Sequence, residues 1–241
     1  MSSHAPTFKP FDPEGRLQVY FRHLPHWRQP GATYMATFRQ GDSIPKAVLE
    51  EWQEDRRRFH AAHGISEDAC RQPEAFSRIY QQIPEGVRRA FEREEAHRLH
   101  LEVDKGHGSC RLRDPSVREE LAKSLRHFHG IRLWLGDYVI MPNHVHAIMT
   151  PIGSHALEDI LGSIKKWVSR KIGARIHSQD AEHSSNSFWQ QESYERIIRD
   201  EVELARFREY IARNPLEAKL PSGSFTYQAA EWLDAFATRA S

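Results

Sequence analysis

The sequence predicts an α+β fold in which an antiparallel sheet carries helices on one face. The chain has 241 residues, 39% of them hydrophobic, which is enough for one full core with an inserted or appended lobe. Strand-like and helix-like segments follow in the order β–α–helical insert–α–β–β–α–β–α, which is typical of a layered α+β domain. Residues 138–150 form two apolar strands around a Pro142-Asn143 turn, which indicates a hairpin.

Composition shifts divide the chain into three parts. Residues 1–30 are polar and interrupted by prolines, which predicts a mostly irregular arm. Residues 31–220 hold the periodic segments and form the main domain, and residues 221–241 form a tail. Within the main domain we expect a helical insertion over residues 45–105. Its part over 66–104 is highly charged and broken by prolines, and we find no chemical constellation there.

Local signals define the individual elements. Residues 32–38 are rich in β-formers and follow Gly31, which predicts a strand. Asp114-Pro115 combines an N-cap with a proline at the first helical position, and Asp200 is a second N-cap. The other elements expected are, in order, strands over 131–140 and 144–150, a helix over 155–176, a strand over 194–198 and a helix over 201–214 that ends before Pro215.

Composition excludes several classes of protein. Charged residues make up 28% of the chain, and no apolar run approaches the ~20 residues that a membrane span needs. The first residues lack a hydrophobic signal segment, and Cys70 and Cys110 provide no disulfide framework. We therefore expect a cytoplasmic protein with no membrane partner. Because the net charge is only +1, nucleic-acid binding would require local basic patches.

The strongest chemical feature is the His-x-His pair formed by His144 and His146. Side chains alternate faces along a strand, so the two imidazoles point the same way, about 6–7 Å apart, and can converge on one divalent ion. The pair alone is also compatible with histidines that are packed or face solvent.

Two further features add polar groups to this pair. Tyr210 and Asn214 are spaced i, i+4 on a predicted helix and share one face, although they also fit a core aromatic residue and a helix C-terminal residue. The helix over 155–176 has a one-sign basic side, which indicates either a solvated face or a phosphate-binding face. Its basic residues are Lys165, Lys166, Arg170, Lys171 and Arg175.

Three motif blocks together resemble a known family. They are Met-Pro-Asn-His-Val-His-Ala-Ile from Met141, Tyr-Glu-Arg-Ile-Ile-Arg-Asp-Glu from Tyr194, and Tyr-Ile-Ala-Arg-Asn-Pro-Leu-Glu-Ala from Tyr210. The blocks look like those of the REP-associated tyrosine transposases, members of the His-hydrophobic-His (HUH) single-tyrosine superfamily. The resemblance spans about residues 32–220 and is weakest over 51–104.

The resemblance implies a ferredoxin-like domain that nicks and rejoins single-stranded DNA, on palindromic hairpin repeats, without a nucleotide cofactor. It implies that His144, His146 and Asn214 hold Mg²⁺ or Mn²⁺, and that Tyr210 forms a 5′-phosphotyrosine intermediate. The partner would be single-stranded or hairpin DNA, and the protein would be a monomer or a homodimer. We expect the DNA contacts to come from Lys165, Lys166, Arg170, Lys171, Arg175 and Arg196.

Several alternatives stay open at this point. Tyr194 competes with Tyr210 as nucleophile because it also lies in a family block. The chain could instead be a repeat-DNA-binding module that no longer cuts, or an unrelated metalloenzyme built on a His-x-His strand. No residue of the sequence identifies the general base.

Overall fold

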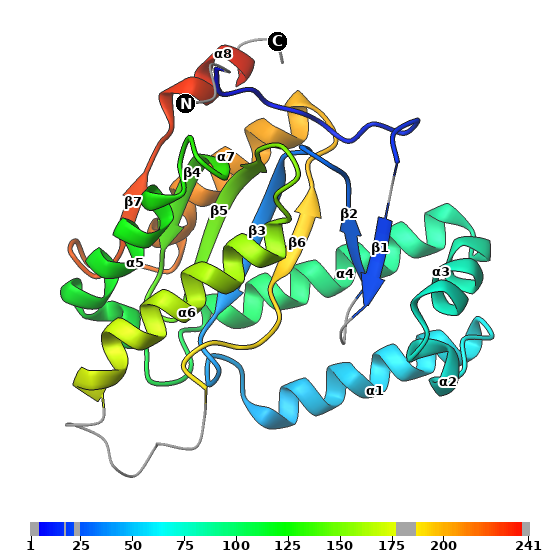
Figure 1. Ribbon diagram of the computed structural model, residues 1–241. Coiled ribbons are helices and arrows are strands. Elements are labelled where there is room, and N and C mark those ends of the chain that lie inside the picture. The colour runs from blue at the N-terminus through cyan, green and yellow to red at the C-terminus, as the bar shows by residue number, and fades with distance from the viewer. Residues whose placement is uncertain (1–4, 17, 22–24, 177–186, 238–241) are drawn as a thin grey trace.

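A five-stranded antiparallel sheet organises the fold. The computed structural model describes residues 5–16, 18–21, 25–176 and 187–237. The strand order is β6-β3-β5-β4-β7, and every pair of neighbours is antiparallel (Figure 1). The strands are β3 (Tyr34–Arg39), β4 (Leu133–Ile140), β5 (His144–Pro151), β6 (Tyr194–Ile197) and β7 (Thr226–Gln228). The predicted α+β class with an antiparallel sheet is confirmed.

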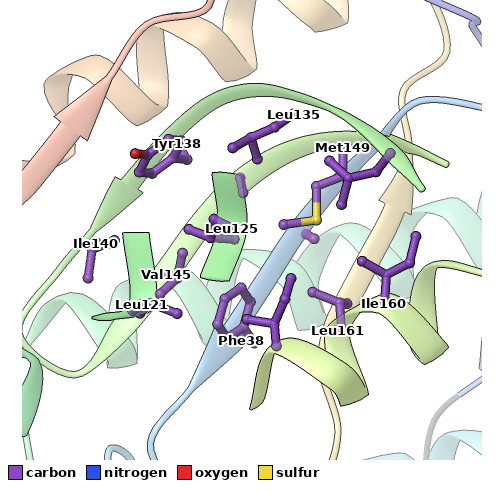
Figure 2. Close-up of a cluster of buried hydrophobic side chains, with 14 of the residues drawn as sticks. Phe38, Leu121, Leu125, Leu135, Tyr138, Ile140, Val145, Met149, Ile160 and Leu161 are labelled. Atoms are coloured by element: carbon purple, nitrogen blue, oxygen red, sulfur yellow. The ribbon is translucent and has the colours of Figure 1, made fainter. Parts of the chain in front are cut away.

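The larger apolar core lies between the sheet and two helices, α5 (Pro115–His127) and α6 (Leu157–Ile176). Both helices lie on the front face of the sheet in Figure 1. Figure 2 shows side chains from both layers meeting there, with Leu121 and Leu125 from α5 opposite Phe38 and Val145 from the strands. Burying this apolar area is the main favourable term for the sheet.

The opposite face of the sheet is also covered, which differs from the expectation of helices on one face only. Helix α7 (Glu201–Glu217) packs Leu204 and Ile211 against Met35 and Ile148 of the sheet. The physical reason is that β3 and β5 are buried at every position, so both of their faces need apolar cover. We call the side that faces α7 the α7 face.

A bulge in β4 sets which side chains reach the α7 face. Its register against β5 shifts between Leu135 and Tyr138, so both of these residues face the larger core although they are three positions apart. Gly136 sits at the bulge, where a Cβ atom would lie 2.9 Å from Ile148. Beyond the bulge, Val139 lies opposite His146 on β5.

Residues 46–104 form a separate helical layer, the α1–α4 region. Its helices are α1 (Lys46–Ala62), α2 (Glu67–Cys70), α3 (Pro73–Gln82) and α4 (Glu85–Asp104). A small apolar cluster around Phe76 and Tyr80 holds α2 and α3 together. Helices α1 and α4 meet through a stacked ring pair, Phe59 and Phe91, with centroids 3.8 Å apart.

The predicted helix starts agree with the structure, whereas one helix end does not. Asp114 caps α5 by accepting from the Ser116 amide, and Asp200 caps α7 by accepting from the Glu203 amide at 2.7 Å. Helix α7 continues through Pro215 to Glu217, where we expected it to end before the proline. A proline in the last turn removes one hydrogen bond, while the amide of Ala218 still bonds to the Asn214 carbonyl.

Both chain ends contribute regular structure. The N-terminal part contains a two-stranded ladder of β1 (Gln18–Phe21) and β2 (Pro25–Arg28). After β7, a 3₁₀ turn (Glu231–Leu233) and α8 (Asp234–Ala237) follow, and Leu233 is buried on the α7 face. Among the described residues, no helix is both long and apolar enough to cross a bilayer.

Candidate active site

Strand β5 presents His144 and His146 to the α7 face of the sheet. Arg39 lies opposite His144, and Thr37 lies opposite His146 on β3, so these four side chains share one face. Both imidazoles are fully buried, and their ring centroids are 4.6 Å apart. The alternation of a strand thus produces the paired arrangement that the sequence predicted.

The Nδ1 atoms of both histidines are held by neighbouring side chains. His144 Nδ1 lies 2.7 Å from Asn143 Oδ1, and the Asn143 amide nitrogen donates to the Val103 and His107 carbonyls. Since these two bonds fix the amide orientation, His144 Nδ1 donates, and in the neutral ring Nε2 keeps its lone pair. His146 Nδ1 lies 2.8 Å from Thr37 Oγ1 in the same way. Such contacts orient histidines that bind metals.

Tyr210 and Asn214 reach the histidines from α7. The Tyr210 hydroxyl lies 3.1 Å from His146 Nε2. Asn214 is buried, and its Nδ2 donates to both carboxylate oxygens of Asp104, at 3.2 and 3.3 Å. The i, i+4 spacing therefore places both side chains on the side of α7 that faces β5.

Two residues of α4 complete the cluster, and sequence reasoning missed both. Asp104 Oδ1 lies 3.4 Å from His144 Nε2, and ligand atoms of Asp104, His144 and His146 all lie within 4.8 Å of one another. The His100 ring stacks on Tyr210 with centroids 5.1 Å apart and meets His146 edge-on. The expectation of no chemical constellation in this region thus overlooked two residues that the structure places beside the strand histidines. The available signal was the i, i+4 spacing of His100 and Asp104, which the many other charges of α4 obscure.

Burial sets the protonation of the site. Burial lowers the pKa of His146, and the nearby His144 and His100 lower it further, so the ring is neutral at pH 7. Burial likewise lowers the pKa of His100 to about 4. Burial raises the pKa of the Tyr210 phenol, and the negative charge of Asp104 raises it further. Tyr210 is therefore protonated in the free protein.

The donor set fits a divalent cation. His144 Nε2 and Asn214 Oδ1 are buried acceptors that have no hydrogen-bond partner among the described residues. Orphaned buried acceptors are costly unless something positive binds them. Two imidazole nitrogens, a carboxylate and an amide oxygen form a mixed N/O set that suits Mg²⁺ or Mn²⁺.

The competing tyrosine, Tyr194, lies on β6 opposite Thr37. Burial, opposed in part by the charge of Arg196 and a hydrogen bond to it, raises the pKa of Tyr194 to about 12. Its ring meets His100 edge-on, with centroids 5.9 Å apart. No hydrogen bond between the Tyr194 hydroxyl and either strand histidine is found in the described part of the chain.

Most of the residues expected to contact DNA lie away from the histidine cluster. Helix α6 packs on the front face of the sheet, away from the α7 face, so its basic residues lie across the sheet from Tyr210 (Figure 1). Lys166 and Arg170 are exposed, and Lys171 lies over the Trp167 ring. Lys165 instead donates to the Gln190 and Gln191 carbonyls and to Ser193.

The other two residues predicted to contact DNA are Arg196 and Arg175. Arg196 is on the α7 face but is bound to the Glu203 carboxylate, with Nε at 3.0 Å. Arg175 is in α6, and its side chain lies outside the described part of the structure.

The structure combines an antiparallel α+β sheet, a His-x-His strand and a helix that carries a tyrosine beside that strand. In a comparison with known families, residues 111–214 match the model of the family described as IS200-like transposases. The match covers less than half of the chain, and over that range the resemblance predicted from the motifs is confirmed. The matched range includes His144, His146, Tyr210 and Asn214 but not Asp104.

Two individual proteins are also similar. An uncharacterized protein of Haemophilus influenzae is 30% identical over an alignment that covers 34% of this chain and 54% of that protein. The chain thus spans about half the length of this relative. A solved structure of a REP-associated tyrosine transposase bound to a REP hairpin aligns with a TM-score of 0.41 at 13% identity, covering 82% of this chain and 74% of that one.

Proposed function

We propose that the protein is a metal-dependent enzyme that nicks and rejoins single-stranded DNA through a 5′-phosphotyrosine on Tyr210. The observation that carries this proposal is the position of the Tyr210 hydroxyl, 3.1 Å from Nε2 of His146, whose ring lies 4.6 Å from that of His144. A phenol next to a cation site can attack phosphorus without a nucleotide cofactor.

The reaction conserves the phosphodiester energy. The Tyr210 oxygen forms a bond to phosphorus as the phosphorus–O3′ bond breaks, the phenolic proton leaves, and the departing O3′ takes up a proton as a free 3′-hydroxyl. Attack by a 3′-hydroxyl on the phosphotyrosine reverses the step and rejoins DNA. A bound divalent cation would stabilise charge on the phosphate oxygens and the leaving O3′.

We propose His144, His146 and Asp104 as the main metal ligands, with Asn214 as a further oxygen ligand. Asp104 also receives both hydrogen bonds from Asn214 Nδ2, which fixes the orientation of the Asn214 amide. His100, whose ring stacks on Tyr210, holds the phenol beside His146.

Hairpin DNA from palindromic repeats is the substrate that the motif resemblance favours. We propose that the exposed Lys166, Arg170 and Lys171 of α6 contact duplex phosphates of such a hairpin, while the strand to be cut lies on the α7 face. A basic face without base readout positions DNA but does not specify sequence.

The test is a cleavage assay on 3′-end-labelled single-stranded hairpins from the flanks of the gene, with Mn²⁺ or EDTA. We expect a labelled fragment that migrates with the denatured protein, because the 5′ phosphate of the downstream product is linked to Tyr210. The adduct should be lost in EDTA and in Tyr210→Phe but should persist in Tyr194→Phe, the matched control.

Two outcomes would overturn the assignment. An adduct that persists in Tyr210→Phe and disappears in Tyr194→Phe would move the nucleophile to β6. Tight hairpin binding without any cleavage by the wild type would indicate a repeat-binding module that does not cut.

A further inference from the structure

A cavity of about 520 Å³ lies between the α1–α4 region and the β3–β6 edge of the sheet. Its volume is within the range of small-ligand sites. Residues on its wall come from α1, α4, β3 and β6, so it exists only because the helical region docks on the sheet.

The cavity reaches the candidate active site at two points. Thr37 forms part of its wall and also holds His146 Nδ1 at 2.8 Å. Tyr194 forms another part and touches the His100 ring, which in turn stacks on Tyr210. Two residues of the cavity wall thus contact the groups that adjoin Tyr210.

Two aromatic side chains form part of the cavity wall. Trp52 of α1 and Phe91 of α4 are half-buried and line the cavity. Trp52 belongs to none of the three buried apolar clusters formed by the described residues, so packing of the core does not explain this large side chain. Proteins that bind single strands use such rings as platforms for bases.

Arg39, which lies opposite His144 on the neighbouring strand, supplies a positive charge to the cavity wall. It is only 7% exposed, and its Nη1 donates to the Gln40 carbonyl and to the Ser43 hydroxyl at 3.1 Å. No ion pair joins it to a carboxylate of the described residues. Burial lowers the pKa of Arg39 to about 10, and the charge of Glu192 offsets this only in part. A buried guanidinium without a paired acid suits an incoming phosphate.

Two acidic residues of the wall already accept hydrogen bonds. Glu95 accepts from Arg56 at 2.9 and 3.0 Å, and Glu92 accepts from the Tyr80 hydroxyl at 3.0 Å. Carboxylates repel phosphate, so these two residues do not provide the phosphate site. Arg39 is the wall residue that suits the phosphate, and the aromatic side chains suit the base.

We propose that this cavity binds one unpaired nucleotide of the DNA strand, with its base against Trp52 and Phe91 and a phosphate on Arg39. The proposal rests on the proposed DNA function of the site and adds a nucleotide-binding subsite to it. The α1–α4 region would then be a single-strand clamp beside the tyrosine.

The test measures binding without cleavage, in EDTA, by fluorescence anisotropy of labelled hexathymidylate and its abasic analogue of equal charge. We expect the full-length protein to bind hexathymidylate at least about 10-fold more tightly than the analogue, because stacking needs a base. Trp52→Ala should remove this preference, and Trp52→Phe should retain most of it. Arg39→Gln should weaken binding of both probes, because each carries phosphates.

Trp167→Ala is the matched control, since Trp167 is an exposed tryptophan on α6, across the sheet. A preference that is absent in the wild type, unchanged in Trp52→Ala, or lost equally in Trp167→Ala would overturn the proposal. Circular dichroism shows whether Trp52→Ala keeps its helices, and Trp52→Phe preserves the test if it does not. Because no step needs cleavage, failure here is distinct from failure of the Tyr210 adduct assay.

Discussion

The sheet and the α1–α4 region build their parts of the site in different ways. The sheet holds His144 and His146 on a strand that is buried at every position, between two apolar layers. The α1–α4 region has one small apolar cluster and relies on charged contacts between its helices, such as Arg56 with Glu95 and Arg98 with Asp55. The sheet thus fixes the positions of His144 and His146, whereas the positions of Asp104 and His100 depend on how the α1–α4 region packs against the sheet.

This difference indicates that the site combines two parts of the fold that differ in stability. Partly exposed ion pairs contribute little to folding, so the α1–α4 region should open more easily than the sheet. Opening would remove Asp104 from His144 while leaving the strand histidines in place. The comparison can be tested by perturbing each region separately.

The largest effect should come from the core of the sheet. Leu125→Ala removes a fully buried side chain of α5 and should lower the free energy of unfolding by about 2–5 kcal/mol. Ile83→Ala, at a buried position in the small cluster, should raise hydrogen exchange in α2 and α3 and leave the sheet protected. Denaturant unfolding measures the free energy lost in Leu125→Ala, and hydrogen exchange measures the protection of each region in Ile83→Ala. Equal loss of protection in α5 and α3 for Ile83→Ala would show one cooperative unit instead.

A smaller effect should appear at the junction of the two regions. Asp104→Asn replaces a charged ligand with a neutral amide and should weaken Mn²⁺ binding about 10- to 100-fold, measured by electron paramagnetic resonance titration. Glu94→Gln, at an exposed position of the same helix, is the matched control and should bind Mn²⁺ like the wild type. Unchanged affinity in Asp104→Asn would show that the α1–α4 region does not contribute to the metal site.

The smallest effect concerns acid sensitivity of the α1–α4 region. His60 is buried at the end of α1 beside Phe76, and burial, together with the charges of Arg56 and His63, lowers its pKa to about 4. A folded pKa below the unfolded value of about 6.5 means that its stabilisation is present at pH 7 and declines as the pH falls from about 6.5 towards 4.

The expected loss between pH 7 and pH 5 is about 1–2 kcal/mol, seen as faster hydrogen exchange in α1 to α3. His60→Phe cannot titrate and should show a flatter pH dependence, with α5 as the internal reference. An identical pH dependence in His60→Phe would show that another group controls acid opening.

Local patterns in the sequence determined the elements and the faces that residues share. Alternation along a strand put His144 and His146 together, the i, i+4 spacing put Tyr210 and Asn214 together, and Asp114 was expected as a cap. These features depend only on neighbours in the chain, because backbone geometry fixes the direction of nearby side chains.

Tertiary structure alone decided which elements meet. It brought Asp104 to His144, placed the basic helix α6 across the sheet from Tyr210, and covered both faces of the sheet. The β4 bulge at Gly136, which sets the register of Val139 opposite His146, also has no signal in local periodicity. The physical reason is that contacts between distant segments follow from packing of whole layers, and a pattern within one helix or strand does not specify its partner.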